Sequence, residues 1–254
     1  MFPILIQIGP FVLHTYGLMV AIGFLLALTV ARRQFQRFGL PLDRLDPMVL
    51  YLMIFGLLGA RALYFALESS ATLRVDPFAF FRLWEGGLVF YGAVIAGVLT
   101  LTVLSRRYGV RFISLTDAFA APLLLGHALG RVGCFAAGCC YGRPTELPWG
   151  VSFSHPASLA PRFTPLHPTQ LYESAGNLLL FFAALWLSRR ERRPGMLTAF
   201  YAVSYGLFRF LVEFLRGDDR GFYFHRFSPS QIVAAALVML GMLVFFHAKK
   251  ESAR

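Results

Sequence analysis

Residues 47–67 read PMVLYLMIFGLLGARALYFAL, a stretch in which Arg61 is the one charged side chain. About 20 apolar residues in a helix span the hydrocarbon core of a bilayer, which is about 30 Å thick. Six more stretches share this character, each of roughly 17–23 residues. They are Phe11–Ala31, Leu88–Leu104, Ile113–Phe135, Pro168–Ser188, Met196–Leu215 and Ser230–His247. Backbone groups in lipid need internal partners, so such spans are helical. The sequence therefore predicts an all-α membrane protein with seven transmembrane helices.

The composition agrees with a membrane protein. The chain is 57% hydrophobic and 15% charged, with a mean hydropathy of +0.62, whereas a soluble domain is about 25% charged. We see no linker, low-complexity segment or internal repeat, so we expect one polytopic domain over residues 1–254. No basic residue precedes the first span, so we do not interpret it as a cleavable signal peptide.

Basic residues alternate between the two predicted membrane faces. The loops after the first, third and fifth spans and the C-terminal tail hold 14 Arg and Lys, against seven on the other side. Cytoplasmic loops are the ones enriched in Lys and Arg, so we place the N-terminus outside and the C-terminus in the cytoplasm. The net charge of +11 follows from these loops. Basic loops of this kind fix the orientation of the helices in the membrane or contact anionic membrane lipids. We therefore expect no nucleic-acid partner.

Polar side chains of several spans fall at one depth, near the outer face. They are His14 and Tyr16 in the first span, Arg61 in the second, Tyr91 in the third, Arg131 in the fourth, His167, Gln170 and Glu173 in the fifth, and Arg209, Glu213 and Arg216 in the sixth. Ionisable groups inside a membrane are costly and mark functional sites by default. We therefore expect a shared polar cavity at the level of the lipid headgroups. Asp117 is the exception, near the inner end of the fourth span.

Arginines that face one cavity are suited to bind a phosphate by paired hydrogen bonds. The depth matches a phospholipid headgroup whose acyl chains run between the helices. An alternative is that Arg209–Glu213 and Arg131–Glu173 are buried ion pairs that hold the bundle together. The sequence leaves both interpretations open.

The stretch Gly126–Gly142, GHALGRVGCFAAGCCYG, holds all three cysteines of the chain. Its small residues allow helices to approach closely, but they do not explain Arg131 in their midst. Cys134, Cys139 and Cys140 have four possible roles: small buried side chains, a disulfide with one thiol left over, a metal site with His127 or His167, or a catalytic thiol. Their spacing matches no standard zinc pattern, so we expect no metal and no cofactor.

The motifs of this chain resemble, in order, those of the bacterial phosphatidylglycerol–prolipoprotein diacylglyceryl transferases. The matching stretches are Gly130–Gly142 for the signature, and also 14–19 (HTYGLM), 59–61 (GAR), 84–87 (WEGG) before Tyr91-Gly92, 167–173 (HPTQLYE) and 206–209 (GLFR) with Glu213 and Arg216. The signature of the family reads roughly G-R-x-G-N-F-x-N-G-E-x-x-G. Here Cys134, Ala137 and Cys139 replace its two Asn and its Glu.

This resemblance implies an enzyme that transfers diacylglyceryl from phosphatidylglycerol to the lipobox cysteine of a prolipoprotein, releasing glycerol 1-phosphate. It implies that Arg131 and Arg209 bind the leaving phosphate, that Glu213 orients an arginine and that Tyr91 is the base candidate. A phenol has a pKa of about 10 in water, so such a base needs help from arginines. The substrate-binding residues would be Tyr16, His14, Arg61, Arg216, Gly142, His167 and Gln170.

The expected location is the bacterial inner membrane, with multiple passes, and the expected partners are phosphatidylglycerol, a lipobox peptide and other membrane lipids. Two alternatives stay open. One is a divergent paralogue that moves a phospholipid-derived group to another acceptor. The other is a non-catalytic lipid-binding or transport protein. Broken helices or inverted repeats favour a transporter, and the sequence has neither.

Overall fold

The computed structural model describes residues 2–9, 11–190, 193–218 and 227–252. Part of the basic loop at 191–192, part of the acidic and basic loop at 219–226, and the end of the basic tail at 253–254 lie outside the described residues. The described chain divides into two compact units, and the single polytopic domain stays a prediction. The first unit is residues 1–34 with 116–254, and the second is residues 35–115.

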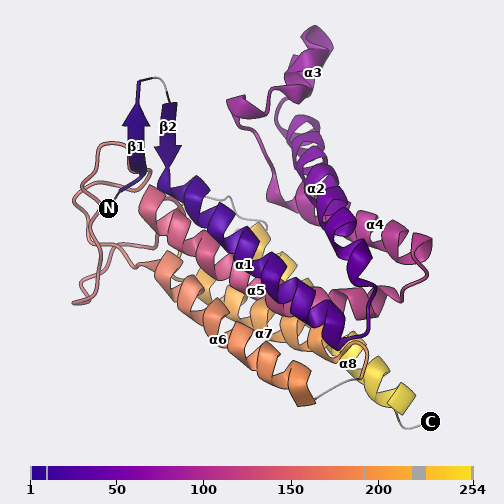
Figure 1. Ribbon diagram of the computed structural model, residues 1–254. Coiled ribbons are helices and arrows are strands. Elements are labelled where there is room, and N and C mark those ends of the chain that lie inside the picture. The colour runs from indigo at the N-terminus through magenta and orange to yellow at the C-terminus, as the bar shows by residue number, and fades with distance from the viewer. Residues whose placement is uncertain (1, 10, 191–192, 219–226, 253–254) are drawn as a thin grey trace. The chain divides into compact units, whose positions relative to one another are not determined.

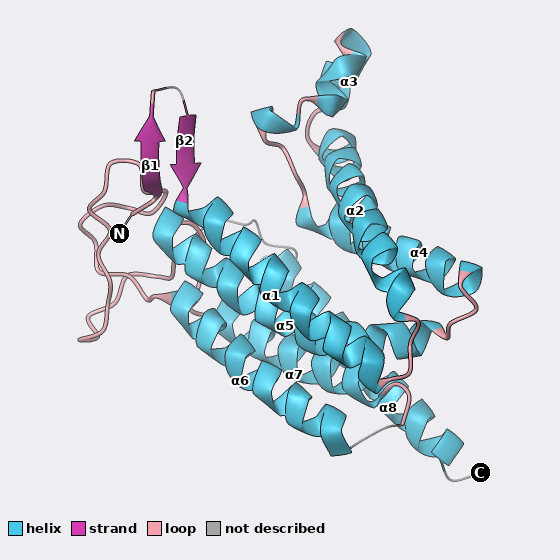
Figure 2. Ribbon diagram, in the orientation of Figure 1, coloured by secondary structure: helices cyan, strands magenta, loops and turns pink. Residues whose placement is uncertain are grey.

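The first unit is a helical bundle with a short hairpin (Figures 1 and 2). Its strands are β1 (Ile4–Ile8) and β2 (Phe11–His14), which pair antiparallel. Its helices are α1 (Thr15–Arg37), α5 (Phe112–Ala137), α6 (Thr169–Arg190), α7 (Met196–Glu213) and α8 (Pro229–Ser252). A core of Ala121, Leu124, Phe181 and Ala184 joins α5 to α6, with α7 packed against it. The bundle therefore places the ends of α5, α6 and α7 near one another.

The start of the first predicted span is wrong by four residues. Phe11–His14 forms a strand, and the helix begins at Thr15. The residues ILIQI and FVLH are rich in β-forming side chains and flank a Gly-Pro turn sequence, which is typical of a hairpin. His14 consequently lies on β2 and not in the first helix.

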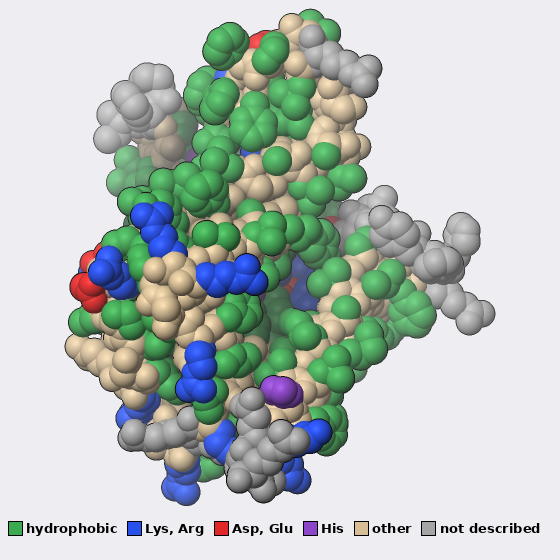
Figure 3. All heavy atoms as spheres, turned by 90° about the vertical axis from the view of Figure 1, so that its right-hand side faces the viewer, with side chains coloured by type: hydrophobic (Ala, Val, Ile, Leu, Met, Phe, Trp, Pro, Cys, Tyr) green, Lys and Arg blue, Asp and Glu red, His purple; other side chains and the backbone are tan. Residues whose placement is uncertain are grey.

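Six helices of the described residues are long and apolar enough to cross a membrane. The seventh, α7, has 18 residues and carries Arg209 and Glu213. Large apolar side chains are exposed along the spans, including Phe182 and Trp186 of α6 and Leu243 of α8, and Figure 3 shows hydrophobic side chains over much of the visible face. The multi-pass membrane protein predicted from the sequence is confirmed at this level, while the seventh span and the orientation stay predictions.

Asp117 has a structural explanation. Its carboxylate accepts hydrogen bonds from the backbone N–H groups of Gly195 (2.6 Å) and Thr198 (2.7 Å), and from the Thr198 hydroxyl (2.6 Å). These groups lie at the N-terminus of α7, where N–H groups have no partner within the helix and favour a negative charge. Asp117 therefore fixes the start of α7 from a neighbouring helix.

The second unit is built on a close pair of helices, α2 (Leu45–Leu67) and α4 (Phe90–Arg107). The segment between them contains α3 (Ser70–Val75) and two 3₁₀ turns, Pro77–Phe81 and Leu83–Glu85, and a third turn, Leu42–Arg44, precedes α2. A Cβ atom added to Gly59 would lie 2.4 Å from Ala96 Cβ and 2.6 Å from the Gly92 carbonyl oxygen. Small residues thus permit the contact of α2 with α4, as in many membrane helix pairs.

Candidate functional site

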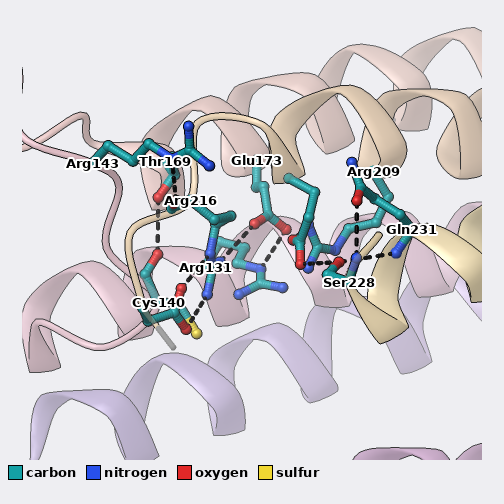
Figure 4. A network of polar contacts seen from close by, with 11 residues as sticks. Arg131, Cys140, Arg143, Thr169, Glu173, Arg209, Arg216, Ser228 and Gln231 are labelled. Carbon is teal, nitrogen blue, oxygen red and sulfur yellow. Dashed lines mark hydrogen bonds and ion pairs between the residues drawn. The ribbon is translucent and has the colours of Figure 1, made fainter. Parts of the chain in front are cut away.

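The centre of the site is Glu173, whose carboxylate lies between two arginines from other elements (Figure 4). Arg131 Nε is 2.9 Å from Glu173 Oε2, and Arg216 Nη1 is 3.1 Å from Glu173 Oε1. The Glu173 side chain is 1% exposed, whereas that of Arg131 is 21% exposed. Glu173 therefore holds two guanidinium groups side by side, and Arg131 keeps part of its surface accessible.

Arg216 lies three residues beyond α7 and has a second carboxylate partner. Its Nε and Nη2 donate to the two oxygens of Asp218 at 2.8 and 2.7 Å. The sequence places Arg216 in the sixth predicted span together with Arg209 and Glu213. Because α7 ends at Glu213, Arg216 instead turns to Glu173 on α6. Burial lowers the pKa of its guanidinium, but the hydrogen bond to Asp218 and the nearby Cys140 more than offset this and hold that pKa above its ordinary value.

Arg209 forms the second ion pair of the site, on α7. Its Nη1 is 2.6 Å from Oε2 of Glu213, one helical turn later, and both side chains are nearly buried. The Ser228 hydroxyl donates to Glu213 Oε1 at 2.6 Å. Ser228 also caps α8, because Gln231 N–H donates to its Oγ (3.2 Å) and its own N–H donates to Gln231 Oε1 (3.0 Å).

The two ion pairs belong to one electrostatic environment. His127 lies one turn before Arg131 on α5, and both Arg131 and Arg209 exert their charge on it. Its ring lies 5.3 Å from that of Tyr205 on α7. The ion pairs considered from the sequence, Arg131–Glu173 and Arg209–Glu213, both form, and they bring their arginines to a common place. The three arginines are paired with three carboxylates, those of Glu173, Glu213 and Asp218. Arg131 has the most exposed side chain of the three arginines, so it is the one best placed to meet an anionic ligand.

The cysteines form a turn at the end of α5, beside the arginines. Gly138 and Cys140 both have left-handed backbone conformations, with φ of 76° and 62°. Side chains of α6 hold the turn, because Gln170 Nε2 donates to the Cys139 carbonyl (2.8 Å) and Thr169 Oγ1 to that of Cys140 (2.9 Å). Gln170 is fully buried, so it supports this turn and does not line an open cavity.

All three cysteines are free thiols in the structure, and the disulfide considered from the sequence is not formed. Hydrogen bonding with Cys134 and Cys139 lowers the pKa of Cys140, and Arg216 and Arg131 lower it further. Hydrogen bonding with the other two thiols raises the pKa of Cys139. Cys140 is therefore the thiol that carries negative charge most readily.

Tyr16 reaches the same place from α1. A Cβ atom on Gly133 would lie 3.2 Å from Tyr16 Cδ2, so the ring packs on α5 where the helix lacks a side chain. Tyr16 interacts electrostatically with Arg131 and with the cysteines. The structure thus brings this predicted substrate-binding residue to the arginine cluster.

Gly142 and His167 form the edge of the turn, and substrate binding by these two residues stays a prediction. Gly142 N–H donates to the His167 carbonyl at 3.0 Å, and a Cβ atom on Gly142 would lie 2.5 Å from His167 Cβ. The His167 ring lies near the Tyr172 hydroxyl, at 3.4 Å. Gly142 is required because the chain segments around His167 and Leu215 approach it too closely for a side chain.

Arg61 and Tyr91 belong to the second unit. All five N–H donors of the Arg61 guanidinium point to backbone carbonyls, so none is left for a substrate phosphate. These carbonyls are those of Phe80 (3.1 Å from Nε), Gly86 and Gly87 (3.1 Å) from Nη1, and Ala79 (2.6 Å) and Arg82 (2.9 Å) from Nη2. The expected substrate contact of Arg61 is replaced by a structural role. Tyr91 lies in the first turn of α4 beside Phe90, and its role as a base stays a prediction, as does substrate binding by His14.

Sequence reasoning missed several residues of the network. Glu173 was considered as the partner of Arg131 alone, yet it also pairs with Arg216. Ser228 and Gln231 were not considered, although Ser-Pro-Ser-Gln at 228–231 has the Ser and Gln spacing of a capping box, with Pro at the first helical position. That pattern predicts the helix start, but not the contact with Glu213.

Comparison with known proteins gives one consistent result. The family model described as prolipoprotein diacylglyceryl transferase matches residues 3–247. The chain is 34% identical to the phosphatidylglycerol–prolipoprotein diacylglyceryl transferase of Clostridium tetani, over 96% of each protein. It is 34% identical to that of Bordetella avium, over 99% of this chain and 96% of the relative, and 32% identical to that of Methylococcus capsulatus, over 95% and 93%. The family predicted from the sequence is thereby confirmed: the chain belongs to the prolipoprotein diacylglyceryl transferases.

Proposed function

We propose that this protein transfers the diacylglyceryl group of phosphatidylglycerol to the lipobox cysteine of a prolipoprotein, at the outer face of a bacterial inner membrane. The observation that carries the proposal is the arrangement of Arg131 and Arg216 on one buried carboxylate, with Arg209 in the same electrostatic environment. The relatives that bear this activity in their names span nearly the whole chain. The proposed orientation has the N-terminus outside, so that the site lies at headgroup depth.

The proposed reaction is a displacement at the glyceryl carbon. The acceptor thiolate forms a C–S bond, the C–O bond to phosphate breaks, and glycerol 1-phosphate leaves with the bonding electron pair. Negative charge grows on the phosphate oxygens as this bond breaks. Fixed cations in a site with little water stabilise such charge more strongly than water does. Arg131 and Arg209 are the proposed phosphate ligands, while Glu173 and Glu213 hold their orientation.

The test uses purified protein with labelled phosphatidylglycerol and a lipobox peptide. Arg131→Ala and Arg209→Ala should each lower the rate of thioether formation by about 10²–10³-fold, the effect of removing one electrostatic stabiliser. Arg107→Ala is the matched control, because Arg107 is exposed at the end of α4, and its rate should equal that of the wild type.

Other outcomes would support the alternatives. Cleavage of lipid without modification of the peptide would indicate a paralogue with another acceptor. Lipid binding without turnover in the wild type would indicate a binding or transport protein. Wild-type rates in both arginine variants would remove the proposed phosphate site.

A further inference from the structure

Cys134, Cys139 and Cys140 converge in space although their spacing in the sequence matches no standard metal pattern. Their three sulfur atoms all lie within 4.8 Å of one another. A tetrahedral Zn²⁺ ion with Zn–S bonds of about 2.3 Å separates its sulfur ligands by about 3.8 Å. The sulfurs therefore need to close by about 1 Å at most, a distance that small rotations of cysteine side chains supply.

The turn that carries these thiols is held in place by its surroundings. The Cys139 and Cys140 carbonyls accept hydrogen bonds from Gln170 and Thr169, and Cys139 N–H donates to the Cys134 carbonyl at 3.1 Å. A Cβ atom on Gly138 would lie 2.1 Å from Ser158 Oγ. The part of the α5–α6 loop around Ser158 therefore packs directly against the cysteine turn. A site whose ligands are oriented by hydrogen bonds and packing binds a metal without a large rearrangement.

The charges near the turn suit a thiolate cluster. Three thiolates around a divalent cation carry a net charge of −1, and Arg131 and Arg216 both interact with Cys140. Among the residues that the structure describes, no His, Asp or Glu joins the group formed by the three sulfurs. Three protein ligands with an open fourth position are typical of a catalytic metal site, whereas structural sites have four.

We propose that the three cysteines bind a thiophilic divalent cation such as Zn²⁺, and that its fourth position takes the acceptor cysteine of the peptide. This inference rests on the proposed function, because it assigns the means by which that site activates its second substrate. On coordination the acceptor thiol releases its proton to solvent, since a coordinating thiol is deprotonated outright. The metal-bound thiolate then attacks the glyceryl carbon, glycerol 1-phosphate leaves, and the cation is unchanged.

This proposal accounts for two features of the chain. A thiol with an ordinary pKa of about 8.5 is mostly protonated at neutral pH, and a metal supplies the activation that a base would otherwise give. Two of the cysteines, Cys134 and Cys139, also stand where the family signature has Asn and Glu. The phosphate-binding arginines are retained, so the change concerns the acceptor side of the site.

The experiment measures metal binding first, without reference to activity. Purified wild-type protein, reduced and then titrated with Co²⁺, should bind one ion per chain with the near-ultraviolet absorption of thiolate coordination. Zn²⁺ should displace it. A lipobox peptide should change the Co²⁺ spectrum, and the same peptide with Cys→Ser should not. Cys140→Ser should lower affinity for Co²⁺ at least about tenfold, with unfolding temperature and elution volume showing that the variant is folded.

The outcomes separate this inference from the proposed function. Stoichiometric binding with a peptide-dependent spectrum supports it, and so does loss of transfer on chelation with recovery on adding Zn²⁺. If the wild type binds no Co²⁺ or Zn²⁺, or if alkylation finds two of its cysteines joined in a disulfide, the metal site is overturned. Transfer that persists in strong chelator overturns it too, while leaving the proposed function intact. Metal binding without any transfer would contradict the proposed function and the assigned role of the metal in it, but not the metal site itself.

Discussion

Arg61 and Arg131 give the same signal in the sequence, a lone arginine inside an apolar span, but their surroundings differ. Arg61 is 2% exposed, and carbonyl oxygens of residues 79–87 occupy all of its N–H donors. The Arg131 side chain is 21% exposed, and its partner, Glu173, also binds Arg216. An intramembrane arginine saturated by backbone acceptors supports the fold. One that shares a carboxylate and keeps accessible surface is placed to bind a ligand.

The largest effect on stability should follow from Arg61→Ala. Five carbonyls lose a hydrogen bond, although that of Ala79 keeps the bond from Arg82 N–H. At about 1 kcal/mol for each of the other four, the cost is about 4 kcal/mol in all. Arg61→Lys should recover only part of this, because an ammonium group has three donors. Thermal unfolding in detergent measures both variants. The contrast between Arg61 and Arg131 fails if Arg61→Ala unfolds like the wild type while losing lipid binding.

A slightly smaller effect should follow from Glu173→Gln. The substitution keeps the shape of the side chain but leaves Arg131 and Arg216 without their shared negative charge. Breaking a buried ion pair by removing one partner costs about 3–5 kcal/mol, and Asp218 offsets part of it for Arg216. We expect a lower unfolding temperature together with slower transfer. Glu146→Gln is the control, since Glu146 is exposed in a loop. An unchanged unfolding temperature in Glu173→Gln would show that the carboxylate does not hold the arginines.

The fold was largely predictable because hydrophobic length is a one-dimensional property. The stretch of residues 47–67 predicts a span from its composition alone, and α2 covers it. Hydrophobic length did not reveal the hairpin of β1 and β2, because Phe11–His14 is as apolar as the helix that follows it. Length and hydropathy do not distinguish a short strand from the first turn of a helix.

The site was predictable in its members but not in its pairings. Depth along the spans placed Arg131, Arg209 and Glu213 near one face, and the structure brings them together. Depth does not reveal which carboxylate meets which arginine, so the sharing of Glu173 by Arg131 and Arg216 was missed. The convergence of the three thiols was left among several possibilities for a related reason, because it depends on the left-handed turn at Gly138 and Cys140 and not on sequence spacing.

A moderate effect should follow from Gly142→Ala, at the edge of the cysteine turn. The new methyl group would lie 2.5 Å from both Cβ and the carbonyl oxygen of His167. Overpacking of this kind costs about 1–3 kcal/mol, and displacement of the turn should slow transfer as well. Gly17→Ala is the matched control, because a Cβ atom there meets nothing within 4 Å, and alanine favours the helix. Equal stability of the two variants would contradict the close approach at Gly142.

The smallest effect should come from Asp76, at the start of the segment that Arg61 holds. A hydrogen bond from Arg82 (2.7 Å) lowers the pKa of Asp76 below its usual 3.8. A carboxyl whose pKa is lower in the folded state stabilises the fold above its unfolded pKa and loses that contribution as the pH falls. The two side chains are more than one-third exposed, so solvent weakens the pair and Asp76→Asn should lower the unfolding temperature by only about 2 °C at pH 7. The difference from the wild type should shrink below about pH 4. A difference that grows toward low pH would reverse the sign of this linkage. A loss of unfolding temperature much larger than this would show that Asp76 helps to hold the segment of residues 79–87, whose carbonyls bind Arg61.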